Sequence, residues 1–151
     1  MNSQTTHVDN GVNVEALLGA RAALAETPQA ARFRWRATSR WMRGTQTQTT
    51  IDGFHGLGGE QRHRQPFTFE TDHPEIFASE DVGATPVEMV LVGLAGCLSA
   101  GIAAVAQHRN IQLRSVMAKV EADMDIQGIL GVDDTVRNGF GAVREIGRAH
   151  V

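Results

Sequence analysis

The fold is decided by residues 83–109, GATPVEMVLVGLAGCLSAGIAAVAQHR. Thr85 suits the N-cap of a helix, Pro86 suits its first position, and the carboxylate of Glu88 in the first turn interacts favourably with the helix dipole. These signals predict a long helix that begins at Pro86 and ends near Asn110.

The middle of this helix, Met89 to Ala106, carries no charged residue and is long enough to be weighed as a membrane span. Much of it is Ala and Gly, which contribute little transfer free energy, and no second apolar span follows to partner it. We therefore expect a helix that is buried on all sides in a soluble core, and no membrane partner.

The composition is that of one ordinary globular domain, with 151 residues, 42% hydrophobic and 21% charged. The 14 basic and 17 acidic residues give a net charge of −3 without a basic block, so we expect no nucleic-acid partner. A single cysteine cannot form an intrachain disulfide, and the N-terminus lacks the pattern of a secretory signal. These features predict a cytoplasmic protein.

Before the long helix, helical spacing of apolar residues predicts a short amphipathic helix over Val14 to Glu26. Alternation and Thr-rich composition then predict a hairpin over Arg32 to Phe54, with its turn at Arg43 and Gly44. The glycine-rich residues 53–64 indicate a loose connection, and residues 65–71, QPFTFET, indicate a third strand.

After the long helix, residues 113–125 alternate apolar and polar side chains, which is typical of a strand. Residues 128–139 turn the chain, and residues 140–144 begin another strand. The expected division is a disordered N-terminus at residues 1–12, a domain at 13–144 that is incomplete at its C-terminal end, and a non-native tail at 145–151, EIGRAHV. This tail has no periodicity or cap, and it reads as the in-frame translation of a common sequencing adapter.

Cys97 lies in the middle of the helix among small residues: Gly93, Gly96, Ser99 and Gly101. A cysteine in such a place is commonly a small packed hydrophobe. The small neighbours also allow a substrate chain to approach the sulfur closely, or another helix backbone to pack there. The pattern leaves a nucleophile and a packing residue both open.

A nucleophilic Cys97 needs a cation, because a free thiol has a pKa near 8.5. The helix dipole acts only over the first turn, which ends well before Cys97. Arginine suits this task because its charge survives desolvation, and Arg43 or Arg40 near the hairpin turn are the candidates. The alternative is that these arginines line a solvated strand face. Glu88 could orient the arginine, but it lies roughly 13 Å along the helix from Cys97, so either the helix breaks near Gly93 or Glu88 is only a first-turn carboxylate.

The histidines have no ligand spacing, so we expect neither a metal nor another cofactor.

Three stretches carry a family resemblance: DHPEIFASEDVGATPVEMVLVGLAGCLSAGIAAVA, NIQLRSVMAKVEADMDIQGILGVDD and VRNGFGAVR. Over residues 33–144 the chain resembles the OsmC/Ohr family of osmotically induced and organic-hydroperoxide-reducing proteins. The most specific element is T-P-x-E followed by A-G-C. The resemblance implies an α+β fold, in which curved antiparallel sheets pack on long central helices and two chains intertwine into a homodimer with active sites at the interface.

The resemblance also implies roles for residues. Cys97 matches the thiolate that attacks the peroxide, and Arg43, or in second place Arg40, is the counterpart of the family's arginine. The family's catalytic glutamate directly follows the proline; here that position is Val87, and Glu88 comes one residue later, as in some divergent branches. The family's resolving cysteine lies on a later helix that is not in this chain.

The predicted function is therefore cysteine-dependent reduction of organic hydroperoxides, with a dithiol as reductant. One alternative is a binding module for a small apolar molecule, in which Cys97 only packs. Another is a redox sensor whose thiol oxidises without turnover.

Overall fold

A computed structural model describes residues 8–151 of the chain. The described residues divide into two compact units, one formed by Glu15–Met89 and the other by Val90–Val151 together with residues 8–14. The first unit contains helix α1, Val14–Glu26, which has no buried residue. The sequence predicted this helix with the same bounds.

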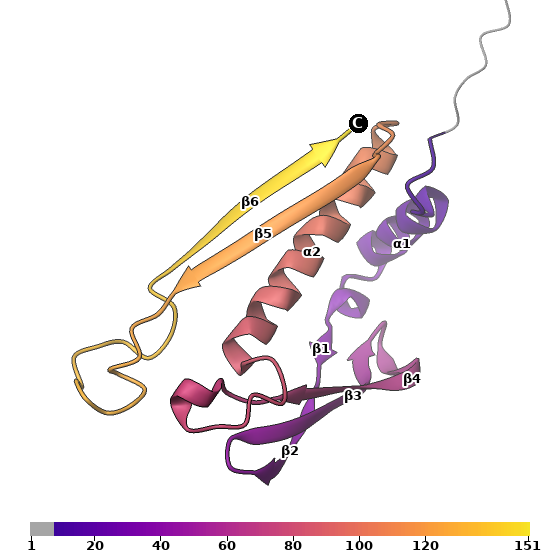
Figure 1. The fold of residues 1–151 in the computed structure, drawn as a ribbon. Helices are drawn as coiled ribbons and strands as arrows, with labels where there is room; N and C mark the ends of the chain where they lie inside the picture. Colours follow the sequence, from indigo (N-terminus) through magenta and orange to yellow (C-terminus); the bar gives the residue numbers. More distant parts are fainter. Residues whose placement is uncertain (1–7) are drawn as a thin grey trace, which may run out of the picture. The chain divides into compact units, whose positions relative to one another are not determined.

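The first unit also contains an antiparallel sheet (Figure 1). Its strands are β1 (Arg34–Trp35), β2 (Thr38–Arg43), β3 (Gln46–Gly56) and β4 (Gly59–Thr71). Strand β3 is central, because β1 and β2 both pair with it and β4 pairs with it as well. The long, Thr-rich β3 is therefore the strand that holds the other three strands in one sheet.

Two tight turns connect the long strands. The predicted hairpin of β2 and β3 is confirmed, with Arg43 paired to Gln46 and Gly44 at φ +48°. The prediction of a loose connection over residues 53–64 was wrong. Leu57 and Gly58 form a second tight turn with φ of +53° and +80°, which matches the twist of the paired strands, so the glycine-rich stretch continues the ladder.

The β3–β4 ladder changes register in the middle. Ile51 pairs with Phe67, whereas Gly53 pairs with Arg62, so residues 63–66 of β4 lie opposite Asp52. Such a bulge bends a strand and increases its twist. A Cβ atom at Gly53 would overlap the carbonyl oxygen of Gln61, so this position requires glycine.

Helix α2, Pro86–His108, begins where the sequence predicted and is followed by Asn110 at φ +56°. The expectation that it is buried on all sides was wrong. Within the described residues Ala106 is its one buried residue, while Val90, Val92 and Val105 are each more than half exposed. The helix is long and apolar enough to cross a membrane, but core helices of soluble proteins pass the same test, so a single such helix is weak evidence.

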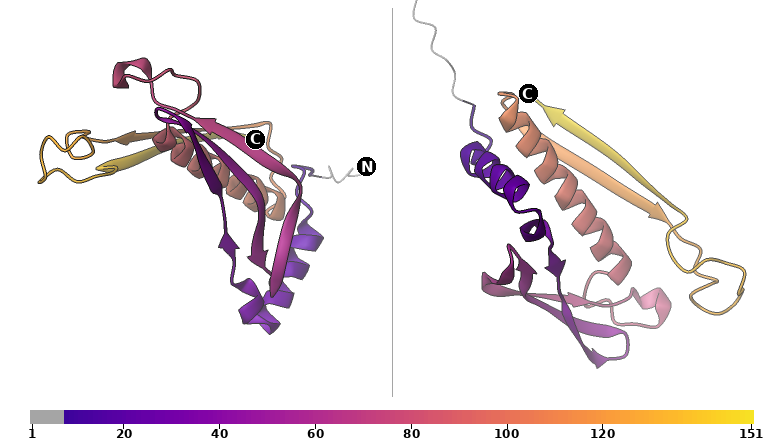
Figure 2. Two further views of the ribbon diagram at one scale, coloured as in Figure 1. Left: turned by 90° about the horizontal axis from the view of Figure 1, so that it is seen from below. Right: turned by 180° about the vertical axis from the view of Figure 1, so that it is seen from behind.

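The second unit also contains a hairpin of β5, Ser115–Asp123, and β6, Ala142–His150. The two strands pair in continuous register from Ser115 opposite His150 to Asp123 opposite Ala142. Figure 2 shows α2 running alongside this hairpin. Residues 145–150, predicted to be a non-native tail without a role in the fold, lie in β6, because β5 offers them a row of unpaired backbone groups. Their origin outside the gene stays a prediction.

The expected disorder of residues 1–12 falls partly outside the described residues, at 1–7. Within the described part, Asn10 is bonded to the segment after α2: its Nδ2 donates to the carbonyl of Ile111 at 2.8 Å, and its Oδ1 accepts from the backbone of Leu113 at 2.9 Å. Hydrogen bonds therefore tie this short polar segment to the second unit.

Buried side chains are scarce over residues 8–151. The buried apolar set consists of Ala106, and the buried polar set of Thr71, Asp72 and Thr85. The α+β class with antiparallel sheets is confirmed, and the intertwined dimer stays a prediction. The three buried polar residues all occur in the segment that runs from the last residue of β4, Thr71, to the residue before α2, Thr85.

Candidate functional site

Cys97 lies in the middle of α2 and is exposed. The glycines beside it leave the helix surface bare, since a Cβ atom added at Gly93, Gly96 or Gly101 would meet nothing within 4 Å. The sulfur is therefore accessible along a smooth strip of helix in the described chain.

An open apolar groove of about 550 Å³ lies beside Cys97 within the second unit. Its α2 side is formed by Cys97, Leu98, Gly101, Ile102, Val105 and Ala106, and its other side by Arg109, Ile111, Leu113, Ala149 and Val151. Arg109 is the one charged residue in this lining. Because Ala149 and Val151 belong to the segment predicted to be non-native, we base the site on the α2 residues.

Glu88 forms a capping box with Thr85 at the start of α2. Its Oε2 accepts hydrogen bonds from the backbone nitrogen and from Oγ1 of Thr85, each at 2.9 Å. These two bonds, the backbone bond first, lower the pKa of Glu88 below its usual value. Since α2 continues unbroken through Gly93, Glu88 is a first-turn carboxylate, and the broken-helix alternative is wrong.

Arg43 lies at the end of β2, at the tip of the first hairpin, and is exposed. Its Nη2 lies 2.7 Å from Oε1 of Glu80, which is also exposed. Arg40, the second candidate, forms no ion pair with any described residue. Of the two arginines, Arg43 is therefore the one that already binds an anionic group.

A buried carboxylate next to Arg43 was missed by sequence reasoning. Asp72 follows β4 directly and is 1% exposed. Its Oδ1 accepts hydrogen bonds from Oγ1 of Thr45 at 2.6 Å and from Oγ of Ser79 at 2.5 Å, and its Oδ2 accepts one from the backbone of Val82 at 3.3 Å. The bonds from Ser79 and Thr45 hold the pKa of Asp72 well below its usual range. A polar residue directly after a strand was the one available signal.

Arg43, Thr45, Asp72, Ser79 and Glu80 line one cavity of about 220 Å³ in the first unit. The predicted site residues are thus divided: Arg43 and Glu88 belong to the first unit and Cys97 to the second. Neither unit alone contains the predicted pair of Arg43 and Cys97.

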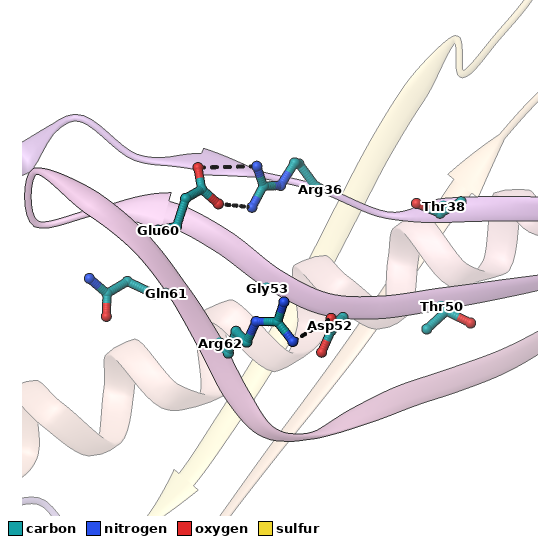
Figure 3. Close-up of a pocket in the computed structure, with 8 residues that line it drawn as sticks. All are labelled: Arg36, Thr38, Thr50, Asp52, Gly53, Glu60, Gln61 and Arg62. Atoms are coloured by element: carbon teal, nitrogen blue, oxygen red, sulfur yellow. Dashed lines mark hydrogen bonds and ion pairs between the residues drawn. The ribbon is translucent and has the colours of Figure 1, made fainter.

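A second charged cavity, of about 460 Å³, lies at the bulge of β3 and β4 (Figure 3). Glu60 binds the guanidinium of Arg36, and Arg62 lies 3.8 Å from Asp52. Every charge here has an exposed partner of opposite sign, so the cavity offers no unbalanced charge to a ligand.

No group of three or more His, Cys, Asp or Glu side chains within residues 8–151 is arranged to hold a metal ion.

The fold and site define an α+β protein with a single accessible cysteine on its central helix. Residues 78–145 match the family model described as OsmC-like protein, so the predicted relationship to the OsmC/Ohr family is confirmed for this segment. The match includes Cys97 and Glu88 but not the hairpin that carries Arg43. No curated protein matches the chain.

Proposed function

We propose that this protein reduces organic hydroperoxides through Cys97. The observation that carries the proposal is the exposed sulfur of Cys97, which lies on the helix matched by the OsmC-like family and borders an apolar groove. Leu98, Ile102 and Val105 on the α2 side would contact the alkyl part of the substrate. An apolar lining favours an organic hydroperoxide over hydrogen peroxide, which has no alkyl part to bury.

In the reaction, the Cys97 thiolate attacks the terminal peroxide oxygen. An S–O bond forms, the O–O bond breaks, and the leaving alkoxide takes a proton to become an alcohol. The resulting sulfenic acid condenses with one thiol of an external dithiol and releases water. The second thiol of the reductant then displaces Cys97, which restores the thiol and leaves an oxidised cyclic disulfide.

Arg43 is the group that keeps Cys97 ionised. Its guanidinium stays charged in an apolar setting and lowers the pKa of a nearby thiol. Oε2 of Glu88 is used for capping, whereas Oε1 has no hydrogen bond among the described contacts. Cys97 and Arg43 are therefore the proposed catalytic pair, and Glu88 serves as the carboxylate that caps the first turn of α2.

The acting species is a homodimer in the cytoplasm. Large apolar side chains are exposed in both units, among them Trp35, Val92 and Met117. Burial of such side chains between two copies of the chain would remove apolar surface from water and so favour association.

The experiment measures consumption of cumene hydroperoxide and of hydrogen peroxide by the purified protein with dithiothreitol as reductant. We expect faster turnover of cumene hydroperoxide, and its loss in Cys97→Ser, while the neighbouring Ser99→Ala keeps the activity. Equal turnover by Cys97→Ser would overturn the proposal.

The apolar groove also supports the second candidate, a binding module for a small apolar molecule. In that case the protein would bind a fluorescent fatty acid with the same affinity in Cys97→Ser and would consume no peroxide. A redox sensor would form the sulfenic acid once per chain, without turnover by any dithiol.

A further inference from the structure

The tip of the first hairpin and the loop before α2 are joined by one buried side chain. Asp72 is the one large side chain below 2% exposure among the described residues. Its Oδ1 is shared by Thr45, two residues after Arg43, and by Ser79, the residue before Glu80. A single carboxylate oxygen thus holds both segments that carry the Arg43–Glu80 ion pair.

The loop around Glu80 needs such an anchor. Ala78 and Asp81 adopt φ of +57° and +55°, a left-handed conformation that is unfavourable for residues other than glycine. The surroundings must hold two such residues so close together. Asp72 does so from both sides, because it accepts hydrogen bonds from Oγ of Ser79 and from the backbone of Val82.

The backbone of Asp72 adds a further constraint. Its nitrogen donates to the carbonyl of Ala84 at 3.2 Å, next to the N-cap Thr85. The hydroxyls of Thr45 and Ser79 also contact each other directly. Hairpin tip, loop and start of α2 therefore form one hydrogen-bonded cluster around Asp72.

The surface ion pair cannot fix Arg43 by itself. Arg43 and Glu80 are 71% and 54% exposed, and exposed ion pairs contribute only about 0–1 kcal/mol. Buried hydrogen bonds to an ionised carboxylate are the stronger constraint on where the hairpin tip lies.

We infer that Asp72 is a positioning residue for Arg43: its buried carboxylate, through Thr45 and Ser79, fixes the hairpin tip from which the guanidinium acts on Cys97. This inference rests on the proposed function. Asp72 touches neither substrate nor sulfur in this role, and its effect on Cys97 passes entirely through Arg43.

The test is the pH dependence of Cys97 alkylation by iodoacetamide in the full chain, in a double-mutant cycle of Asp72→Asn and Arg43→Ala. Asparagine keeps the size of the side chain but removes the charge. We expect Asp72→Asn to raise the apparent pKa of Cys97, which appears as an about twofold or larger loss of alkylation rate at pH 6.5. In the Arg43→Ala background the same change should have no further effect.

Each other outcome is decisive. The positioning role is overturned if Arg43→Ala shifts the apparent pKa of Cys97 and Asp72→Asn does not. It is also overturned if Asp72→Asn still shifts this pKa in the Arg43→Ala background. Both results leave the proposed function intact. No shift of this pKa by Arg43→Ala contradicts the proposed function itself.

Should Asp72→Asn fail to fold, as judged by circular dichroism, Thr45→Val and Ser79→Ala each remove one hydrogen bond to Asp72 and take its place in the cycle. Asp134→Asn, on an exposed loop, is the matched control.

Discussion

Thr85 and Glu88 cap each other at the start of α2: Oε2 of Glu88 accepts two hydrogen bonds from Thr85, and Oγ1 of Thr85 accepts one from the backbone of Glu88 at 3.3 Å. This reciprocal capping box satisfies backbone donors that the helix leaves free. It also explains why T-P-x-E is an efficient helix start, with proline in the position that needs no donor.

Removal of either partner is expected to destabilise the protein. Thr85→Ala should lower the free energy of unfolding by about 1 kcal/mol, a typical loss for an N-cap. Glu88→Ala should cost less, because its carboxylate is exposed, and the double variant should cost less than the sum of both. Urea denaturation measures the free energy of unfolding of each variant. The control Glu26→Ala, at the exposed end of α1, should change the free energy of unfolding by less than about 0.5 kcal/mol. A loss in Glu26→Ala equal to that in Thr85→Ala would mean that the capping box stabilises the protein no more than an ordinary exposed residue does.

The hydrogen bonds to Asp72 predict a specific pH dependence of stability. Because the pKa of Asp72 is lower in the folded than in the unfolded protein, its stabilising contribution is complete above the unfolded pKa of about 3.9 and falls as the pH drops below that value. The difference in unfolding free energy between the wild type and Asp72→Asn should therefore be constant from pH 7 to 5 and shrink towards pH 3. A difference that grows on acidification would contradict the assigned contacts. Asp134→Asn should show no such trend.

Two glycine-to-alanine substitutions, one at the bulge of β3 and one in α1, are predicted to have opposite effects on the stability of the protein. Gly53→Ala should destabilise the protein, because the new Cβ overlaps the backbone carbonyl of Gln61 and the strands must separate. Gly19→Ala, in the open middle of α1, should stabilise it by about 0.5–1 kcal/mol through helix propensity. Thermal unfolding of both variants gives the comparison, and a neutral Gly53→Ala would mean that the ladder is looser at the bulge than the register implies.

The bare strip of α2 is predicted to lie in the homodimer interface. Gly96 has open space around it in the single chain, so Gly96→Leu should leave the chain folded but weaken dimerisation by tenfold or more, the size expected when an added side chain must be accommodated in a packed interface (about 1–3 kcal/mol). Analytical ultracentrifugation measures the dimer dissociation constant. Gly19→Leu on α1 is the control, and an unchanged dimer in Gly96→Leu would place the interface elsewhere.

Local signals were sufficient for most of the secondary structure. The capping residues placed the start of α2, and alternation placed β2 and β5, because both patterns depend on residues close in sequence. The glycine-rich stretch was misread, since a two-residue turn at Leu57 depends on backbone conformation that composition does not reveal.

The site was harder to predict for a different reason. Cys97 stood out as the single cysteine, but the burial of α2 depends on what covers the helix, which its own sequence does not encode. Asp72 was missed because its partners, Thr45 and Ser79, lie on separate segments and meet only in the fold.

In the proposed site, a guanidinium from the first hairpin keeps Cys97 ionised. The most direct measurement is the rate of Cys97 alkylation against pH in the wild type, in Arg43→Ala and in the matched control Arg64→Ala, an exposed arginine on β4. We predict an apparent pKa well below 8 for the wild type and for Arg64→Ala, and a value near 8.5 for Arg43→Ala, which is that of an unperturbed thiol. A wild-type value near 8.5, or a low value that survives Arg43→Ala, would contradict the account.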